Sequence, residues 1–479
     1  MLFNSLQFFV FLPIVAGVYF LMPARGRGLL LLLASYVFYM AWEPAYVLLI
    51  LFSTGVDYGV GIAMGRHTDR AGRRPWLVLS LCANLGMLFF FKYYNFFRDS
   101  LHQVYGWVGM DGPLPYVEVL LPVGISFYTF QTLSYSIEVY RGNQAVERRL
   151  DQFALYVAFF PQLVAGPIER AGNLLPQLAK LPGFEYNRVR NGLQLIAWGL
   201  FKKVVIADRL AQCVDYIYAQ PGEQSGFALI VGTVFFAYQI YCDFSGYTDM
   251  AIGTAQIFGV RLMENFRQPY RATSLADFWS RWHISLSSWF RDYLYIPLGG
   301  NQVSAGRLVL NLWVVFLLSG LWHGANWTYV VWGGIHVIFL LVERRFRQGE
   351  AMTWLQRSLA QCRTFVVVCF AWVFFRAASI TDAFAVFGGL GRGWGEIPLG
   401  AGFWGWLERS LGLPLWELGF SVVLLVGLGV VQNGQSKTGL REWVNARPLW
   451  QRWCIYSVGV WLVFLFGVFR QKEFIYFTF

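Results

Sequence analysis

Charged residues are scarce in this sequence. Asp, Glu, Lys and Arg make up 14% of its 479 residues, whereas roughly 25% is usual in soluble domains. Hydrophobic residues make up 57%, and the mean hydropathy is +0.47. This balance excludes an ordinary soluble domain and predicts a polytopic membrane protein. Because lipid offers the backbone no hydrogen-bond partners, the expected fold class is all-α.

Cysteine pairs and nucleotide-binding loops are also missing. The six cysteines form no C-x-x-C pair and show no metal-ligand spacing, so neither a disulfide framework nor a metal is expected. Gly253 and Gly299-Gly300 lack the strand-turn-helix context of a nucleotide fingerprint. No internal repeat or low-complexity linker divides the chain, which predicts a single domain over residues 1–479. The cysteines are Cys82, Cys213, Cys242, Cys362, Cys369 and Cys454.

Basic residues give the chain a net charge of +11, but they gather in short loops between apolar stretches. That placement indicates orientation in a membrane and argues against a nucleic-acid partner. Roughly 10 to 12 apolar stretches are long enough to span a membrane core about 30 Å thick. Because basic loops face the cytoplasm, both termini are expected outside, in the periplasm of a bacterial inner membrane. The clusters are Arg25/Arg27, Arg66/Arg70/Arg73/Arg74, Arg141/Arg148/Arg149, Arg344/Arg345/Arg347 and Lys437/Arg441/Arg447/Arg452.

The apolar pattern changes in the middle third of the chain. N-terminal helices are predicted for residues 1–140. The first, Gln7–Met22, is expected to be a retained helix and not a signal peptide, and the next is Gly28–Trp42. C-terminal helices with an outward-facing tail are predicted for residues 344–479. Between them, Pro161, Gly166-Pro167 and Gly246 interrupt shorter apolar pieces. Broken or re-entrant helices persist at membrane depth only inside protein or beside a water-filled cavity. Residues 141–343 are therefore the expected catalytic core.

Three polar, aromatic-rich patches stand out within this core. The first runs from Asp243 to Asp249, the second from Asp277 to Asn301, and the third from Leu321 to Trp327. The third holds His323 between apolar runs on both sides. Ionisable groups in hydrocarbon are costly enough that they usually mark a functional site. His323 is therefore the first candidate for catalysis.

These patches resemble signatures of the membrane-bound O-acyltransferase (MBOAT) family, within it the bacterial branch that O-acetylates exported polysaccharides such as alginate, cellulose or peptidoglycan. The resemblance implies an acyltransferase with a helical fold of that family. It also implies that the histidine matching His323 is catalytic. The matching segments are Leu121–Tyr128, Ala165-Gly166-Pro167, Asp277–Asn301, Leu321–Trp327 and the Phe/Tyr-rich C-terminus.

Acyl transfer to a hydroxyl needs a base for the hydroxyl proton and a donor for the developing oxyanion. A buried, neutral imidazole at His323 suits the first task, with Trp322 and Asn326 as supporting neighbours. The alternative is a histidine that bonds across a pair of helices. The resemblance implies a second active-site position at His283, predicted to lie on a cytoplasmic helix, although an interfacial histidine packed among tryptophans would fit as well.

The remaining charged candidates are two aspartates and three arginines. Asp243 and Asp249 are expected to orient the histidines or, preferably, to pair with a basic residue such as Arg281. Arg281, Arg291 and Arg271 suit the phosphates of coenzyme A, because guanidinium groups bind phosphate oxygens in pairs. Lipid head groups are the alternative ligands for these arginines.

The sequence ends with Phe474-Ile475-Tyr476-Phe477-Thr478-Phe479. The tail resembles a C-terminal aromatic motif of the related D-alanine export systems, in which a tyrosine is thought to carry the acyl group. The resemblance thus implies a third catalytic position, Tyr476, which would accept acetyl and present it outside. An interfacial aromatic belt explains the same residues without chemistry.

The combined prediction is a membrane O-acetyltransferase that takes acetyl from cytoplasmic acetyl-CoA and relays it outward to a cell-surface polysaccharide. The chain contains no segment like the SGNH-hydrolase-like transferase with which the family usually works, so a periplasmic or membrane-anchored partner of that kind is expected besides the bilayer. Transfer of D-alanine or another acyl group by the same fold remains an alternative. So does a secondary transporter or flippase, which would show repeats with matching broken helices.

Overall fold

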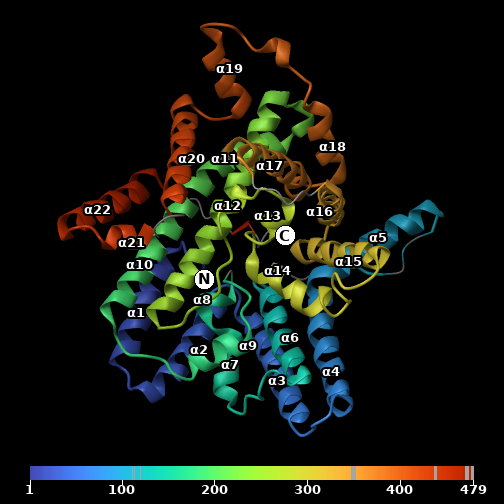
Figure 1. Cartoon of the computed structure of the whole chain (residues 1–479), viewed down its shortest axis with the longest axis vertical. Helices are drawn as coiled ribbons and strands as arrows, with labels where there is room; N and C mark the ends of the chain where they lie inside the picture. The colour runs from blue at the N-terminus through green and yellow to red at the C-terminus, as the bar shows by residue number, and fades with distance from the viewer. Residues whose placement is uncertain are drawn as a thin grey trace. The chain divides into compact units, whose positions relative to one another are not determined.

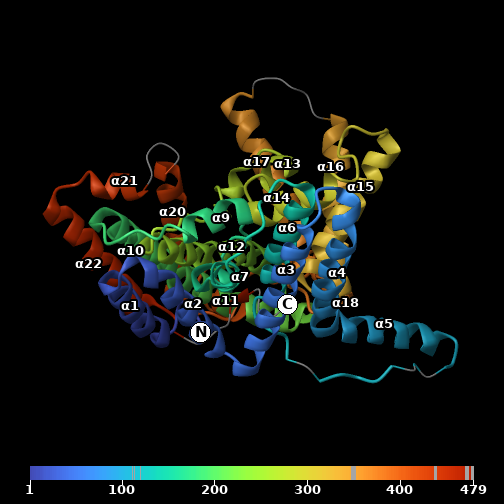
Figure 2. The same ribbon diagram turned by 90° about the horizontal axis from the view of Figure 1, so that it is seen from below.

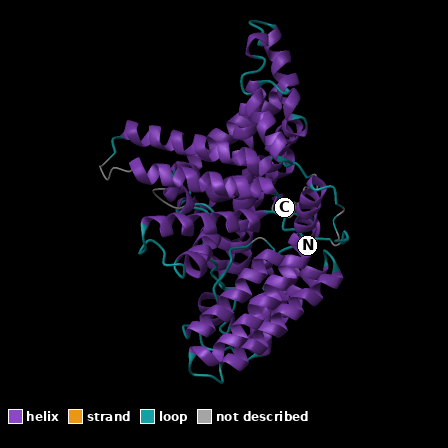
Figure 3. Cartoon of the chain, turned by 90° about the vertical axis from the view of Figure 1, so that its right-hand side faces the viewer, coloured by secondary structure: helices purple, strands orange, loops and turns teal. Residues whose placement is uncertain are grey.

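The computed structural model describes residues 1–110, 112, 114–118, 120–164, 166–346, 352–435, 440–469 and 474–475. All regular secondary structure in these ranges is helical (Figure 3). The prediction of an all-α, multi-pass membrane protein is confirmed.

Seven helical segments of the described chain are long and apolar enough to cross a membrane. The sequence predicted roughly 10 to 12 apolar stretches. The stretches at Gln7–Met22 and Gly28–Trp42 form helices of only 16 and 17 residues, which are shorter than any of the seven segments. The seven segments are Pro44–Met64, Arg70–Trp107, Gly226–Ile257, Ala305–His323, Trp354–Arg376, Leu415–Gly434 and Leu449–Phe466.

The chain forms two compact units. The first consists of residues 1–193 and 251–263, and the second consists of residues 194–250 and 264–479. These boundaries differ from the predicted divisions of the chain after residues 140 and 343. The prediction of a single domain stays a prediction.

The first unit is a helical bundle in which α3, α4 and α6 pack against one another (Figure 2). Asp69 begins α4 by accepting a hydrogen bond of 3.0 Å from the Gly72 amide. Its helices are α1 (Leu6–Leu21), α2 (Ala24–Met40), η1 (Pro44–Tyr46), α3 (Val47–Met64), α4 (Arg70–Leu88), the π-helix η2 (Phe89–Tyr93), α5 (Tyr94–Trp107), α6 (Ile125–Arg141), α7 (Leu150–Ala158), α8 (Phe160–Leu163), α9 (Ala171–Leu178) and the beginning of α10 (Tyr186–Leu200).

A buried polar network joins α3, α4 and α6. The fully buried Asp57 carboxylate accepts hydrogen bonds from Ser80, from Asn84 at 2.8 Å and from Ser136 at 2.8 Å. A carboxylate in a membrane helix is stable only with such partners. Asp57 is not among the residues predicted from the sequence, because its partners lie 23 to 79 positions away along the chain.

The second unit contains the three polar patches of the sequence, and most of its helices are labelled in Figure 1. A capping box begins α17, in which Thr353 and Gln356 satisfy each other's backbone amides. Its helices are the end of α10, the π-helix η3 (Phe201–Ala207), α11 (Asp208–Ala219), η4 (Pro221–Glu223), α12 (Gly226–Ile257, up to residue 250), η5 (Pro269–Arg271), α13 (Leu275–Trp279), α14 (Ile284–Phe290), the π-helix η6 (Arg291–Tyr295), α15 (Ala305–His323), α16 (Trp327–Phe346), α17 (Trp354–Arg376), α18 (Ile380–Gly389), η7 (Trp394–Glu396), α19 (Gly402–Leu411), α20 (Leu415–Gln435), α21 (Leu440–Asn445) and α22 (Leu449–Phe466).

Glycines let α15 and α16 approach closely. A Cβ atom on Gly320 would overlap the carbonyl oxygen of Tyr329, and one on Gly333 would overlap that of Phe316. Small residues at such positions let helices in a membrane pack backbone against backbone. The pair of helices α15 and α16 thus forms a rigid support for His323, the last residue of α15.

Candidate functional site

The two candidate histidines lie together in the second unit. The ring centroids of His283 and His323 are 6.2 Å apart, although the residues are separated by 40 positions in the chain. Both side chains are buried, with 0% and 2% of their surface exposed. The Trp322 ring contacts both, at 5.6 Å from His283 and 5.1 Å from His323. The structure therefore brings together three of the predicted site residues.

Aromatic rings enclose the His323 side chain. Trp332 of α16 and Phe375 of α17 meet the imidazole edge to face, at 5.1 and 5.4 Å between centroids. Both rings are buried. Such an enclosure has a low dielectric constant and strengthens any hydrogen bond that the imidazole makes to a substrate.

His283 does not lie in a helix, contrary to the prediction. It interrupts the segment between α13 and α14 as the left-handed N-cap of α14, with φ 43° and ψ 54°. A left-handed conformation at a residue with a side chain costs about 1 to 3 kcal/mol and is concentrated at functional sites. The helical prediction failed because it treated the whole polar patch as one element.

Asn265 holds the turn at His283 in place. Its backbone carbonyl accepts a hydrogen bond of 3.0 Å from the Ile284 amide. Its side-chain oxygen accepts bonds from both the amide of Ser285, at 3.2 Å, and the hydroxyl, at 2.6 Å. This buried residue is not among the candidates predicted from the sequence. An isolated asparagine before a polar patch does not indicate a functional role, because its hydrogen bonds to Ile284 and Ser285 form only when the two segments meet in the fold.

Burial also sets the charge of His283, which lies outside the seven apolar segments. Loss of contact with water lowers the pKa of this imidazole to about 3. The ring is therefore neutral over the ordinary range of pH, with one nitrogen able to donate and the other able to accept. A neutral imidazole of this kind can donate a hydrogen bond to a reacting carbonyl.

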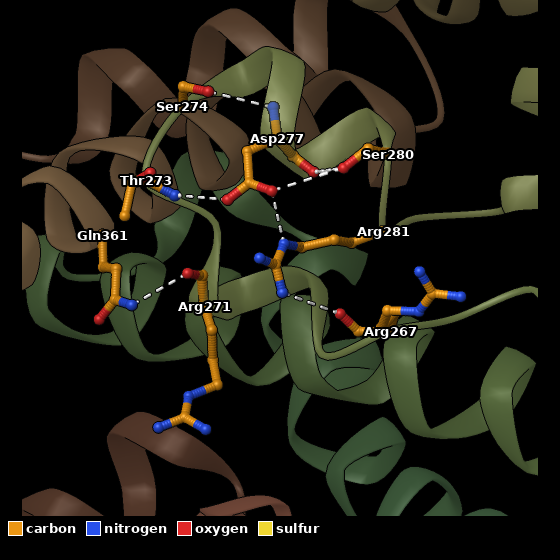
Figure 4. Close-up of polar contacts among 8 residues, drawn as sticks. All are labelled: Arg267, Arg271, Thr273, Ser274, Asp277, Ser280, Arg281 and Gln361. Atoms are coloured by element: carbon orange, nitrogen blue, oxygen red, sulfur yellow. Dashed lines mark hydrogen bonds and ion pairs between the residues drawn. The ribbon is translucent and has the colours of Figure 1, made fainter. Parts of the chain in front are cut away.

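The carboxylate of Asp277 organises the start of the same segment (Figure 4). Ser274 caps α13 by accepting a bond of 3.0 Å from the Asp277 amide. The carboxylate accepts a bond from the Thr273 amide and forms an ion pair of 2.6 Å with Arg281. Arg281 is thus held by Asp277, and a phosphate would have to compete with that carboxylate.

Arg271 and Arg291 are held differently. Figure 4 shows the Arg271 side chain extending away from Asp277. Its guanidinium donates to the amide oxygens of Gln268, at 3.1 Å, and of Asn433. Arg291 pairs with Asp292 and is 62% exposed. Nothing in these contacts distinguishes phosphate binding from binding to lipid, so the predicted role of all three arginines stays a prediction.

Asp243 and Asp249 pair with lysines and not with Arg281. The π-helix η3 presents Lys202 to Asp249 at 2.8 Å and Lys203 to Asp243 at 2.6 Å. The predicted ion pairs of both aspartates are present, but their partners are lysines and not the predicted Arg281. π-Helices are rare, and many of those that occur lie at functional sites. Hydrophobic periodicity does not reveal that Lys202 and Lys203 lie in such a helix.

Asn326 supports the loop after His323. Its side-chain oxygen accepts a hydrogen bond of 3.0 Å from the Thr328 amide at the start of α16. Its side-chain nitrogen donates to the Ala378 carbonyl, at 3.1 Å, just after α17. The residue thus joins α16 to the end of α17, which carries Phe375.

Tyr476 lies outside the described residues. The two residues before it are described and contact α12. The Phe474 ring lies 5.4 Å from that of Phe244, which in turn meets His283 edge to face at 4.7 Å. The beginning of the C-terminal motif is therefore one aromatic ring away from a candidate catalytic histidine.

Comparison with known proteins identifies the family. Residues 87–381 match the model of MBOAT, the membrane-bound O-acyltransferase family. The chain belongs to this family. The matched segment includes both His283 and His323. The resemblance inferred from the motifs is confirmed, and the protein is an acyltransferase.

The names of similar proteins agree with this class. The probable alginate O-acetylase AlgI of Pseudomonas aeruginosa is 43% identical over 81% of this chain and 74% of its own length. The peptidoglycan O-acetyltransferase of Helicobacter pylori is 36% identical over 81% of this chain and 80% of its own length. A teichoic acid D-alanyltransferase of Bacillus subtilis is 29% identical over 53% of this chain and 68% of its own length.

Proposed function

We propose that this MBOAT protein is the membrane component of a bacterial polysaccharide O-acetylation system, which moves acetyl from cytoplasmic acetyl-CoA to the outer face of the inner membrane. The observation that carries the proposal is the buried pair of His283 and His323. The names of the alginate and peptidoglycan O-acetylating relatives support acetyl as the acyl group. Those relatives match more of the chain, at higher identity, than the D-alanyltransferase does.

In the proposed reaction, His323 takes the proton of the acceptor hydroxyl as its oxygen attacks the thioester carbonyl. A carbon–oxygen bond forms, the carbon–sulfur bond breaks, and the proton passes to the departing thiolate. His283 donates a hydrogen bond to the oxyanion. Two rings with centroids 6.2 Å apart can both reach one small acyl group. Arg271, Arg281 and Arg291 are the candidates for the coenzyme phosphates.

The acceptor hydroxyl in this proposal belongs to Tyr476, and the resulting phenolic ester is a reactive acetyl donor. A periplasmic or membrane-anchored SGNH-hydrolase-like protein would then transfer the acetyl to the sugar. Both termini of the present chain would face the periplasm.

The first test follows label from radioactive acetyl-CoA into the purified protein and its products. His323→Ala should reduce transfer by about 10²- to 10⁴-fold, the usual contribution of a positioned general base. His102→Ala, a half-buried histidine of the first unit bonded to the Leu114 carbonyl, is the control and should retain activity. Equal label transfer by His323→Ala and the wild type would refute the proposed base.

The second test concerns the carrier. Tyr476→Phe removes only the hydroxyl and should abolish polymer acetylation at unchanged protein level and membrane insertion. Tyr186→Phe, an exposed tyrosine of the first unit, is the matched control. Full acetylation of the polymer by Tyr476→Phe would exclude the carrier role while leaving the test of His323 intact.

A further inference from the structure

The chain after α22 returns along η3 and α12. Arg209 donates a hydrogen bond of 2.6 Å to the carbonyl of Phe466, the last residue of α22. The Val468 amide then donates to the Val204 carbonyl at 2.8 Å. Both partners belong to the helix formed by η3 and α11. The start of the tail is therefore attached by its backbone and not only by apolar contacts.

A second attachment lies at the start of the aromatic motif. The Ile475 amide donates a hydrogen bond of 2.8 Å to Oδ2 of Asp243. The Phe474 side chain is fully buried, and its ring lies 4.6 Å from that of Tyr247. Phe244, three residues before Tyr247 in α12, also contacts the Phe474 ring. One turn of α12 thus offers a charged acceptor and two aromatic contacts to the tail.

The Asp243 carboxylate is itself held rigidly. Its other oxygen forms an ion pair of 2.6 Å with Lys203, which also pairs with Asp208 at 2.9 Å. All three side chains are at most 4% exposed. A carboxylate fixed in this way can accept the amide hydrogen bond without first being ordered, and a hydrogen bond to a charged acceptor is stronger than one between neutral groups.

We propose that Asp243, Phe244 and Tyr247 form an intramolecular docking site for the tail segment 474–475, with Asp243 as its positioning residue. The inference rests on the proposed carrier role of Tyr476, which it deepens. Because Tyr476 follows Ile475 directly, docking limits the region that its hydroxyl can reach. Holding the acceptor near the reacting group replaces a search by the tail with a local encounter.

The test measures docking separately from chemistry. Hydrogen–deuterium exchange of the Ile475 amide in the purified full-length protein reports the bond to Asp243. Asp243→Ala should speed this exchange at least tenfold, whereas Asp243→Asn, which keeps an acceptor oxygen, should restore much of the protection. Asp208→Asn is the control, because it alters the ion pairs of Lys203 but leaves the acceptor for Ile475.

Phe474→Ala provides an independent variant that leaves every buried charge in place. It should likewise speed exchange at Ile475. In both undocked variants, acetyl loading of Tyr476 should fall at least tenfold in kcat at an unchanged KM for acetyl-CoA, because the donor site is intact. Because misfolded protein would also lower the apparent kcat at an unchanged KM, the rates are compared per mole of folded protein, measured by size-exclusion chromatography in detergent.

Two results would separate the hypotheses. Unchanged exchange at Ile475 in both Asp243→Ala and Phe474→Ala would overturn the docking site, whatever the activity. Faster exchange in these variants, combined with a wild-type protein that never carries label on Tyr476, would support the docking site and overturn the carrier role.

Discussion

Lys203 should be among the residues of the second unit least tolerant of replacement. Its ammonium group lies between the carboxylates of Asp243 and Asp208, at 2.6 and 2.9 Å, and all three side chains are at most 4% exposed. Lys203→Met keeps much of the side-chain volume but removes the only positive charge of this triad. Two carboxylates would then remain buried without their shared partner.

The size of the effect follows from burial. Breaking a buried ion pair by removing one partner costs about 3 to 5 kcal/mol, since the remaining charge is uncompensated. Two such carboxylates place Lys203→Met at the upper end of that range. The Arg149–Asp151 pair has the same separation, 2.6 Å, but its side chains are 67% and 49% exposed. Arg149→Met should therefore change stability by about 0 to 1 kcal/mol.

Unfolding of the purified protein by sodium dodecyl sulfate in mixed micelles would measure both differences. The triple variant Lys203→Met, Asp208→Asn, Asp243→Asn removes every charge of the triad and should recover part of the lost stability, because no uncompensated charge stays buried. Equal, small effects of Lys203→Met and Arg149→Met would refute the reasoning. The triad would then have to be hydrated in the membrane-bound protein.

Three further results are expected. Asn265→Ala should lower acyl transfer by at least tenfold with little change in donor binding, because the turn loses its side-chain acceptor; steady-state kinetics with acetyl-CoA would reveal this, and an unchanged kcat would contradict it. Asp57→Ala should destabilise the first unit by about 1 to 3 kcal/mol, because the buried side chains of Ser80, Asn84 and Ser136 lose their acceptor, whereas the exposed Asp99→Ala should cost under about 1 kcal/mol in the same unfolding assay. Gly320→Val should separate α15 from α16 at the Tyr329 carbonyl and reduce both folded yield and activity in a membrane expression trial, while normal yield would show that the helices can move apart.

The sequence was sufficient to locate His323 and the helices around it. Apolar runs bounded by glycine and tryptophan predict helices because lipid leaves the backbone no other partners. The runs before and after His323 are α15 and α16 in the structure. A histidine between two such runs is informative on its own, since few ionisable residues are tolerated there. Local pattern and the membrane environment give the same answer at this position.

The arrangement around His283 could not be derived in this way. Its left-handed backbone is stabilised by Asn265, which lies 18 positions earlier and outside the predicted patch. The pairing of Asp243 with Lys203 likewise joins residues 40 positions apart. Hydrophobic periodicity reports which face of a helix is buried and says nothing about which polar groups meet there. The choice of Arg281 as a partner was wrong for this reason.

Neighbouring residues of α12 connect the ionic and the aromatic parts of the site. Asp243 faces Lys203 and the Ile475 amide, while the next residue, Phe244, contacts both Phe474 and the ring of His283. A charge directly beside the histidines would change their protonation, whereas an intervening ring transmits position without bringing charge closer. Movement of the tail would therefore reach His283 through packing. On this reasoning Phe244→Leu, which keeps an apolar side chain but shortens it, should lower the kcat of acyl transfer from labelled acetyl-CoA while the ion pairs of Lys203 stay in place; an unchanged kcat per mole of folded protein would contradict it.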